Sequence, residues 1–329
     1  MQQSERRFFQ SLTVNDVEFP LNALNRISYI ESTQLDSPQL LLVCEDKYGL
    51  IQDLLQLKED SESAEVLFSD SFRDDAQDYK AKFLLLSAKT TQEYDGRIEL
   101  SLMEEPAFNL LKRGRKIYTK ATPRAVLRDL TQVDVEMEDV PKVNDFHLID
   151  QRKSNLIRRM CSEYGRLGFF SRGQFFFQTP QKLMDSEADI EYEYGNPVAE
   201  NKIENYEVIS NAYLMKELSD FEYSGWQIEK GAVRPPIKPT KAVRITPFPV
   251  QYTLKNLASY IVPAVDLMVE GDFRLTVGAK LSLKWHTGLA EMPLHESFPT
   301  EILITRLSHF EKGNQFKTRI IGAVLPEQD

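Results

Sequence analysis

Apolar residues in this sequence gather in many short runs, and the pattern within the runs is that of β-strands. From Ile98 to Leu102, apolar and polar side chains alternate strictly, as on a strand with one buried face. The longest clean apolar run, residues 40–44, has about five residues, whereas a membrane-spanning helix needs about 20. We therefore expect a β-rich chain without membrane insertion.

Strand-like runs dominate both ends of the chain. In the first 104 residues their polar connections are typical of a small barrel or sandwich, and residues 40–44 look buried on both faces. Residues 232–249 contain five prolines, which favour an extended connector or an edge segment. The expected strands are residues 8–14, 27–32, 40–44, 66–68, 83–86, 98–103, 189–194, 206–210, 279–285, 302–310 and 315–324.

The middle of the chain has helical signals instead. Thr122 and Pro123 are typical of an N-cap and a first helical position, and an apolar stripe follows them. Residues 153–164 have helical spacing and end at Gly165. A β-hairpin is expected at residues 169–177, and shorter helices at residues 106–112 and 252–260.

Bulk composition narrows the possible roles. The formal net charge is −10, so the overall field does not attract nucleic acid. Residues 1–7 are polar and no hydrophobic signal segment follows them, so secretion by a signal peptide is not expected. The two cysteines, Cys44 and Cys161, lie far apart in apolar segments and are interpreted as buried free thiols.

The sequence lacks the common catalytic and metal-binding motifs: Gly-x-Ser-x-Gly, His-Glu-x-x-His, a phosphate-binding Gly-rich loop and Cys-x-x-Cys. A thiol–imidazole pair of Cys161 with His147 is disfavoured, because an apolar helix face makes a thiol inert. The spacing of His286, His295 and His309 matches no ligand motif, and isolated structural histidines are more common. We predict no catalytic residue, no cofactor and no metal.

One basic cluster stands out: Lys112, Arg113, Arg115 and Lys116, around Gly114. The expected helix before it would place these cations at a helix C-terminus, where the dipole favours them. Ordinary solvated surface, a protein interface and nucleic-acid contact, with Tyr118 stacking on a base, all remain open. We take the four cations as a candidate protein interface.

Several segments resemble those of a known family. Residues 120–130, with Thr122-Pro123, look like the Thr-Pro helix of phage tail hub proteins, and residues 145–165 resemble the helix that follows it. The hairpin at 169–177 is also similar, as are Val277-Gly278 and the paired segments 304–309 and 316–319. The sequence departs from the pattern at Asn155 and Ile157, where Asp and Phe are commoner. The family is the baseplate hub of contractile phage tails, related to the hub half of type VI secretion spikes.

The resemblance implies a mostly β, α+β fold. Two tube-like β-barrel domains, 1–105 and 187–329 (the second with the Pro-rich connector), would be braced by a small helix-and-hairpin domain, 106–186. It further implies a homotrimer whose pseudo-sixfold ring joins the hexameric tail tube protein to a separate trimeric spike protein. DNA or cargo would pass through the lumen, which should be acidic or neutral. Tape-measure and baseplate wedge proteins are further candidate partners, and the location would be the virion tail, assembled in the host cytoplasm.

Two other roles stay open. The abundant carboxylates leave room for a hydrolase acting on peptidoglycan, although no motif supports one. A carbohydrate-binding β-protein would use an exposed Trp226 or Trp285 as a stacking platform, but Trp285 ends an expected strand and fits a core position better.

Overall fold

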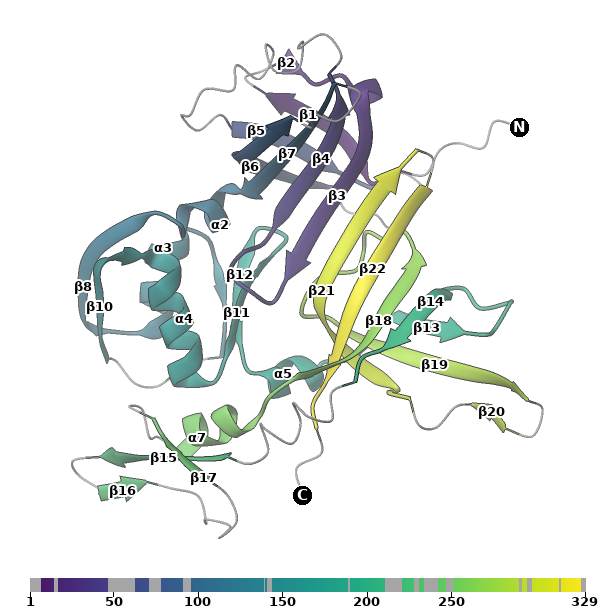
Figure 1. Ribbon diagram of the computed structural model, residues 1–329. Helices are drawn as coiled ribbons and strands as arrows, with labels where there is room; N and C mark the ends of the chain where they lie inside the picture. The colour runs from purple at the N-terminus through teal and green to yellow at the C-terminus, as the bar shows by residue number, and fades with distance from the viewer. Residues whose placement is uncertain are drawn as a thin grey trace.

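The computed structural model describes most of the chain. It covers residues 7–14, 17–46, 63–70, 78–90, 96–138, 140, 144–188, 190–210, 221–227, 231–233, 242–246, 251–289, 292–294, 298–313 and 315–326. Strands dominate both ends, and helices and a hairpin occupy the middle (Figure 1). The expected mostly β, α+β class is confirmed.

The N-terminal part is made of strands whose alternation buries one face. They are β1 (Phe9–Val14), β2 (Val17–Glu18), β3 (Leu24–Ser32), β4 (Gln39–Glu45), β5 (Ser63–Phe68), β6 (Tyr79–Thr90) and β7 (Arg97–Glu104). The expectation that residues 40–44 are buried on both faces is wrong. Leu40, Leu42 and Cys44 are buried, whereas Leu41 and Val43 are half-exposed on the other face.

The C-terminal strands continue the same sheet. They are β13 (Ile190–Tyr194), β14 (Ile203–Val208), β18 (Val262–Glu270), β19 (Lys280–Leu289), β20 (Met292–Leu294), β21 (Glu301–Lys312) and β22 (Gln315–Val324). The predicted hairpin of β21 with β22 is confirmed. Strand β18 was not predicted, although it lies between β14 and β22 in the sheet.

A single strand pairing joins the two ends of the chain. β3 and β21 run antiparallel, with Glu31 opposite Leu307 and Tyr29 opposite His309. The result is one 14-stranded sheet, in which the purple N-terminal strands continue into the yellow C-terminal ones (Figure 1). Among the described residues no closed barrel forms, so the expected pair of barrels is corrected to an open, continuous sheet. The strands of both ends belong to one sheet because β21, which pairs with β19 and β22, also pairs with β3.

The middle of the chain packs its helices against short strands. Its elements are α2 (Glu105–Asn109), β8 (Arg113–Ala121), α3 (Pro123–Thr131), β9 (Val135–Glu136), β10 (Asn144–Arg152), α4 (Lys153–Tyr164), β11 (Leu167–Ser171), β12 (Gln174–Gln178) and α5 (Pro180–Met184). Thr122 caps α3 by accepting a 3.3 Å hydrogen bond from the Ala125 amide, and Gly165 ends α4 with φ at +61°. Both predicted helices and the predicted hairpin are confirmed.

Besides the sheet of β9, β11 and β12 in the middle, two further small sheets are separate from the large one (Figure 1). One is the ribbon of β8 with β10; neither strand was predicted. The other contains β15 (Phe221–Gln227), β16 (Gly231–Val233) and β17 (Ala242–Ile245), beside helix α7 (Gln251–Ala258). The five prolines of the expected connector lie outside the described residues.

Buried apolar side chains form three clusters, one under the N-terminal strands, one in the middle and one under the C-terminal strands. The first also contains Phe273 and Phe316 from the C-terminal part, and both rings stack on Phe8. The core therefore crosses the β3–β21 junction. The division into domains at residues 105 and 186 stays a prediction.

Candidate functional site

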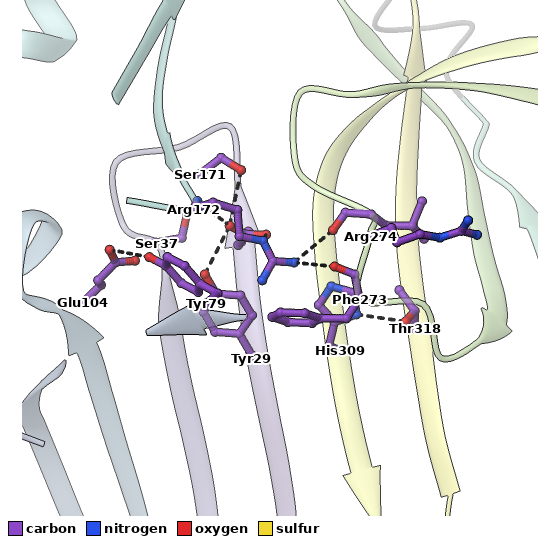
Figure 2. Close-up of polar contacts among 12 residues, drawn as sticks. Tyr29, Ser37, Tyr79, Glu104, Ser171, Arg172, Phe273, Arg274, His309 and Thr318 are labelled. Carbon is purple, nitrogen blue, oxygen red and sulfur yellow. Dashed lines mark hydrogen bonds and ion pairs between the residues drawn. The ribbon is translucent and has the colours of Figure 1, made fainter. Parts of the chain in front are cut away.

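The β3–β21 junction contains a buried network of charged and polar side chains. Three parts of the chain meet there: strand β3, the turn between β11 and β12, and the segment 271–279 that follows β18 (Figure 2). The site is therefore built by segments that are remote in sequence.

Arg172 lies at the centre of the network. It occupies the hairpin turn with φ at +46°, so its side chain leaves the middle of the chain and enters the junction. Its Nη2 donates to the carbonyl oxygens of Phe273, at 3.0 Å, and of Leu275, at 3.2 Å. The guanidinium carbon lies 3.7 Å from the centre of the Phe273 ring, a cation–π distance. Arg172 thus binds the middle of the chain to the C-terminal part.

Glu31 ties the same turn to β3. Its side chain has no exposed surface, and its Oε1 accepts from the Arg172 amide at 3.3 Å and the Tyr29 hydroxyl at 3.2 Å. The Ser171 hydroxyl also donates to Oε1, at 3.4 Å, and Oε2 lies 3.9 Å from Arg172 Nε. A buried carboxylate is costly unless it is paired and hydrogen-bonded, and this one has both kinds of partner.

His309 lies on the β21 side of the junction. Its Nδ1 is 2.9 Å from the Thr318 hydroxyl, which also accepts a 3.1 Å hydrogen bond from the Asp272 amide. Burial, reinforced by the charge of Arg172, lowers the pKa of His309 to about 3. The imidazole is therefore neutral near pH 7 and acts as a packing and hydrogen-bonding group.

A second buried carboxyl lies on the other side of Arg172. The Tyr79 hydroxyl donates to Glu104 Oε1 at 2.8 Å, and burial raises the pKa of Glu104 to about 7. Carboxyl groups with a shifted pKa often mark active sites. Here, however, Glu31 and His309 have no exposed surface that a substrate could reach. We conclude that the network holds three parts of the chain in register. The sequence had shown residues 171–173 only as a turn.

The four predicted interface cations do not act as one group. Residues 113–116 lie in strand β8, so the expectation of a helix C-terminus is wrong. Because successive side chains of a strand point to opposite faces, Arg113 and Arg115 lie on the exposed face of the β8–β10 ribbon and Lys116 lies on the other face. There Lys116 Nζ lies 2.8 Å from Asp129 of α3. Lys112 is exposed in the turn before β8, and its carbonyl accepts from the Lys153 amide at 3.1 Å.

Lys116 therefore has a partner within the chain, although its side chain is 51% exposed. The Tyr118 hydroxyl also donates to Asp129, at 2.7 Å, so both residues fix α3 against β8. The pKa of Asp129 is lowered by these hydrogen bonds, which outweigh its partial burial. The interface assignment stays a prediction for Lys112, Arg113, Arg115 and Lys116.

The remaining candidate residues lie apart from one another. His286 Nε2 is 2.7 Å from Glu193, His147 is exposed on β10, and His295 lies outside the described residues. Cys44 is buried and Cys161 partly so; both are free thiols, and burial raises the pKa of each to about 12. Within the described ranges, no group of three or more His, Cys, Asp or Glu is placed to hold a metal ion.

The two tryptophans differ in environment. Trp285 is 2% exposed and donates to the Pro299 carbonyl at 2.8 Å, so its predicted core position is confirmed. Trp226 on β15 is 71% exposed. The described part of the chain also has no helix long and apolar enough to cross a membrane.

The face of the large sheet that points away from the core has ion pairs between its C-terminal strands β14, β18 and β22. Lys317 pairs with Glu204, and Arg319 Nε lies 2.9 Å from Asp266. Near the β21–β22 turn a hollow of about 820 Å³ is lined by Arg26, Glu45, Arg97, Glu99 and Lys312, among others. Lys317 and Arg319 on this face thus each have an acid beside them.

Solved structures with the same fold are phage tail proteins and a secretion component. The tail protein from Neisseria meningitidis MC58 superposes with a TM-score of 0.66 at 10% identity, over 98% of this chain and 97% of that one. The 43 kDa tail protein of prophage MuSo2 from Shewanella oneidensis gives a TM-score of 0.60 at 11% identity, over 99% and 100%.

A third similar structure is a component of the E. coli type VI secretion system, described as similar to the T4 tail proteins gp27 and gp5. Its TM-score is 0.52 at 11% identity, over 97% of this chain and 78% of that one. No model of a known family and no curated protein sequence matches the chain. The expected similarity to tail hub proteins is therefore confirmed at the level of the overall fold.

Proposed function

We propose that this protein is the structural hub of a contractile tail baseplate. Three copies would form a pseudo-sixfold ring that joins the hexameric tail tube to a trimeric spike, with DNA or cargo passing through the lumen. The protein would be part of the virion tail and would have no catalytic activity.

The observation that carries this proposal is the similarity over nearly the whole length of two tail proteins. Both alignments cover 97% or more of each chain, so the arrangement of the two ends and the middle is shared, and not only one common domain. The resemblance in the helices at residues 120–130 and 153–164 is an independent reason for the same proposal.

The continuous sheet supports a rigid ring. A ring that transmits force between tube and spike needs its parts fixed relative to one another. Here the two ends of the chain share backbone pairing through β3 and β21, and Arg172 holds the middle against both.

The charge on the uncovered sheet face supports passage of DNA. We propose that this face lines the lumen. A stripe of unpaired cations would retain the phosphate backbone, whereas the Lys317–Glu204 and Arg319–Asp266 pairs leave little net positive charge. Arg319→Ala with Lys317→Ala should therefore leave DNA binding absent in a filter-binding assay, as in the unmodified protein. DNA binding by the unmodified protein that these changes abolish would contradict the passage model.

Native mass spectrometry tests the oligomeric state directly. We expect a species of about 114 kDa, three times the 38.0 kDa chain, and a ring in negatively stained electron micrographs. A larger complex should form when a cognate trimeric spike is added. A chain that stays monomeric alone and with the spike would refute the proposal.

The alternative of a peptidoglycan hydrolase has a simple test. Zymography on cell-wall substrate should give no lysis band, because the strongly perturbed carboxyl Glu104 is only 3% exposed. A band that disappears in Glu104→Gln would favour the enzyme instead.

A further inference from the structure

Large apolar side chains are concentrated on the outer faces of the two small sheets. Among the described residues nine such side chains are exposed, and five of them belong to the β8–β10 ribbon or to the β15–β17 sheet. Exposed apolar groups scattered singly need no explanation, but clusters on one face mark interaction sites.

The first cluster covers the outer face of the β8–β10 ribbon. Ile117 and Ile149 are 60% and 63% exposed. In the strand register Ile117 lies opposite His147 and Ile149 opposite Arg115, so these four side chains share one face. Arg113, next along β8 on this face, is exposed and lies 3.8 Å from Asp150. We call this surface the ribbon face; it is apolar at its centre and carries arginine beside the isoleucines.

The opposite side of the ribbon is already used. Tyr118, Phe146 and Leu148 point inward and belong to the middle core cluster. The side chains of its inner face therefore anchor the ribbon, while Ile117 and Ile149 on its outer face are exposed. Strands β8 and β10 lie at one edge of the molecule (Figure 1).

The second cluster covers one face of the β15–β17 sheet. Trp226, Val243 and Ile245 are 71%, 45% and 84% exposed. The parallel register pairs Val243 with Glu222 and Ile245 with Ser224. Because Glu222, Ser224 and Trp226 alternate on the same side of β15, the three apolar side chains share that side. We call this surface the tryptophan face.

The other side of this sheet also has its own contacts. Arg244 lies over the Phe221 ring, with its guanidinium carbon 3.5 Å from the ring centre. This arginine points away from the tryptophan face, which consequently has no Lys or Arg among its paired residues on β15 and β17.

The two faces complement each other chemically. The ribbon face offers arginine beside isoleucine, and the tryptophan face offers an indole beside valine and isoleucine. Arginine stacks favourably on tryptophan, and the apolar side chains of both faces would be removed from water together.

We propose that the ribbon face of one copy of this chain packs on the tryptophan face of the next copy, with Arg115 stacking on Trp226. Since the two surfaces differ, the contact is head to tail, and head-to-tail contacts close into rings when the rotation allows it. This inference rests on the proposed oligomeric hub and names the contact that would build it.

A complementation experiment tests the pairing. One variant carries Ile117→Asp, which places a charge in the ribbon face; the other carries Ile245→Asp, which does so in the tryptophan face. Each variant alone should be monomeric by native mass spectrometry. An equal mixture should restore one functional contact and give a 1:1 dimer, twice 38.0 kDa, because each variant supplies the face that the other has lost.

The matched control is Val198→Asp. Val198 is 87% exposed and lies outside both faces, so this variant should keep the oligomer of the unmodified chain. Circular dichroism of all three variants should match the unmodified protein, since every changed side chain is exposed.

The outcomes separate this inference from the proposed function. A trimer that persists in both Ile117→Asp and Ile245→Asp would overturn the inferred contact and leave the hub intact. Variants that are monomeric but form no dimer when mixed would also overturn it. Complementation with a parent oligomer other than a trimer would support the contact and refute the trimeric hub. A parent that is monomeric at every concentration measured would refute both.

Discussion

Replacing Arg172 by methionine should strongly destabilise the protein. Methionine keeps an unbranched apolar stem but removes the guanidinium with its charge and all its donors. The carbonyls of Phe273 and Leu275 would lose their partner, and Glu31, with no exposed surface, would lose the cation beside it. Removing one partner of a buried ion pair costs about 3–5 kcal/mol, and we expect a loss of unfolding free energy in that range.

Two further variants isolate the cause. Arg319→Met breaks an ion pair with Asp266 at the protein surface, where the Arg319 side chain is 55% exposed, and should cost less than about 1 kcal/mol. Adding Glu31→Gln to Arg172→Met removes the uncompensated charge and should restore roughly 1–2 kcal/mol of the loss.

Urea denaturation measures all of these variants. Unfolding can be followed by circular dichroism and by the fluorescence of the buried Trp285, and free energies come from linear extrapolation. If Arg172→Met costs no more than Arg319→Met, Arg172 does not hold the junction and the reasoning is refuted. The same conclusion follows if Glu31→Gln restores nothing.

Three other predictions follow from local geometry and charge. Gly165→Ala should lower the unfolding free energy by roughly 3 kcal/mol or more in thermal denaturation, because φ is +61° and a Cβ would lie 2.7 Å from backbone atoms of α7. The control Gly313→Ala, at φ +60° with nothing within 4 Å of the added Cβ, should lower it by only about 1–2 kcal/mol. Equal losses in the two variants would argue against the α4–α7 contact. Burial raises the pKa of Glu311 from 4.5 to about 7, so the folded state binds more protons than the unfolded state between these values, and this group should lower stability by roughly 1–3 kcal/mol as pH rises from 4.5 to above 7. Glu104, with the same raised pKa, contributes in the same direction, so Glu311→Gln should reduce the pH dependence of unfolding by urea but not abolish it. An unchanged pH dependence in Glu311→Gln would contradict the prediction. Burial raises the thiol pKa of Cys44 and Cys161 to about 12. Iodoacetamide should therefore modify neither cysteine in the folded protein at pH 8, and both cysteines in urea. Rapid modification of the folded protein, detected by mass spectrometry, would show that these thiols are accessible.

Local features of the middle were readable from the sequence because neighbouring residues determine them. Thr122 and Pro123 begin α3, and residues 153–164 form α4 up to Gly165, at the predicted positions. Capping and helical spacing act within a few residues, so no distant segment had to be known.

The basic cluster shows where local reasoning fails. Gly114 looked like the end of a helix, but α2 ends at Asn109 and Gly114 lies in β8. Pairing with β10, about 30 residues further along the chain, decides the conformation of this segment. The same pairing separates Lys116 from Arg113 and Arg115, which no charge pattern in the sequence indicates.

The candidate site was the least predictable part. Arg172 is one residue of a hairpin turn in the sequence, and its partners Glu31 and Phe273 are more than 100 residues away. Buried charges are identified by their surroundings, so only the folded chain reveals the network around Arg172.

The sequence by itself determined the strand-rich composition, the helices of the middle and their ends, because alternation, helical spacing and capping are short-range properties. The tertiary structure alone decided that β3 pairs with β21, which turns two expected barrels into one sheet, and that Arg172 enters the junction between them. Strand edges carry the same backbone donors and acceptors everywhere, so local sequence does not select the partner. The selection comes from the shared core around Tyr29, His309 and Phe273, which forms only when both ends of the chain come together.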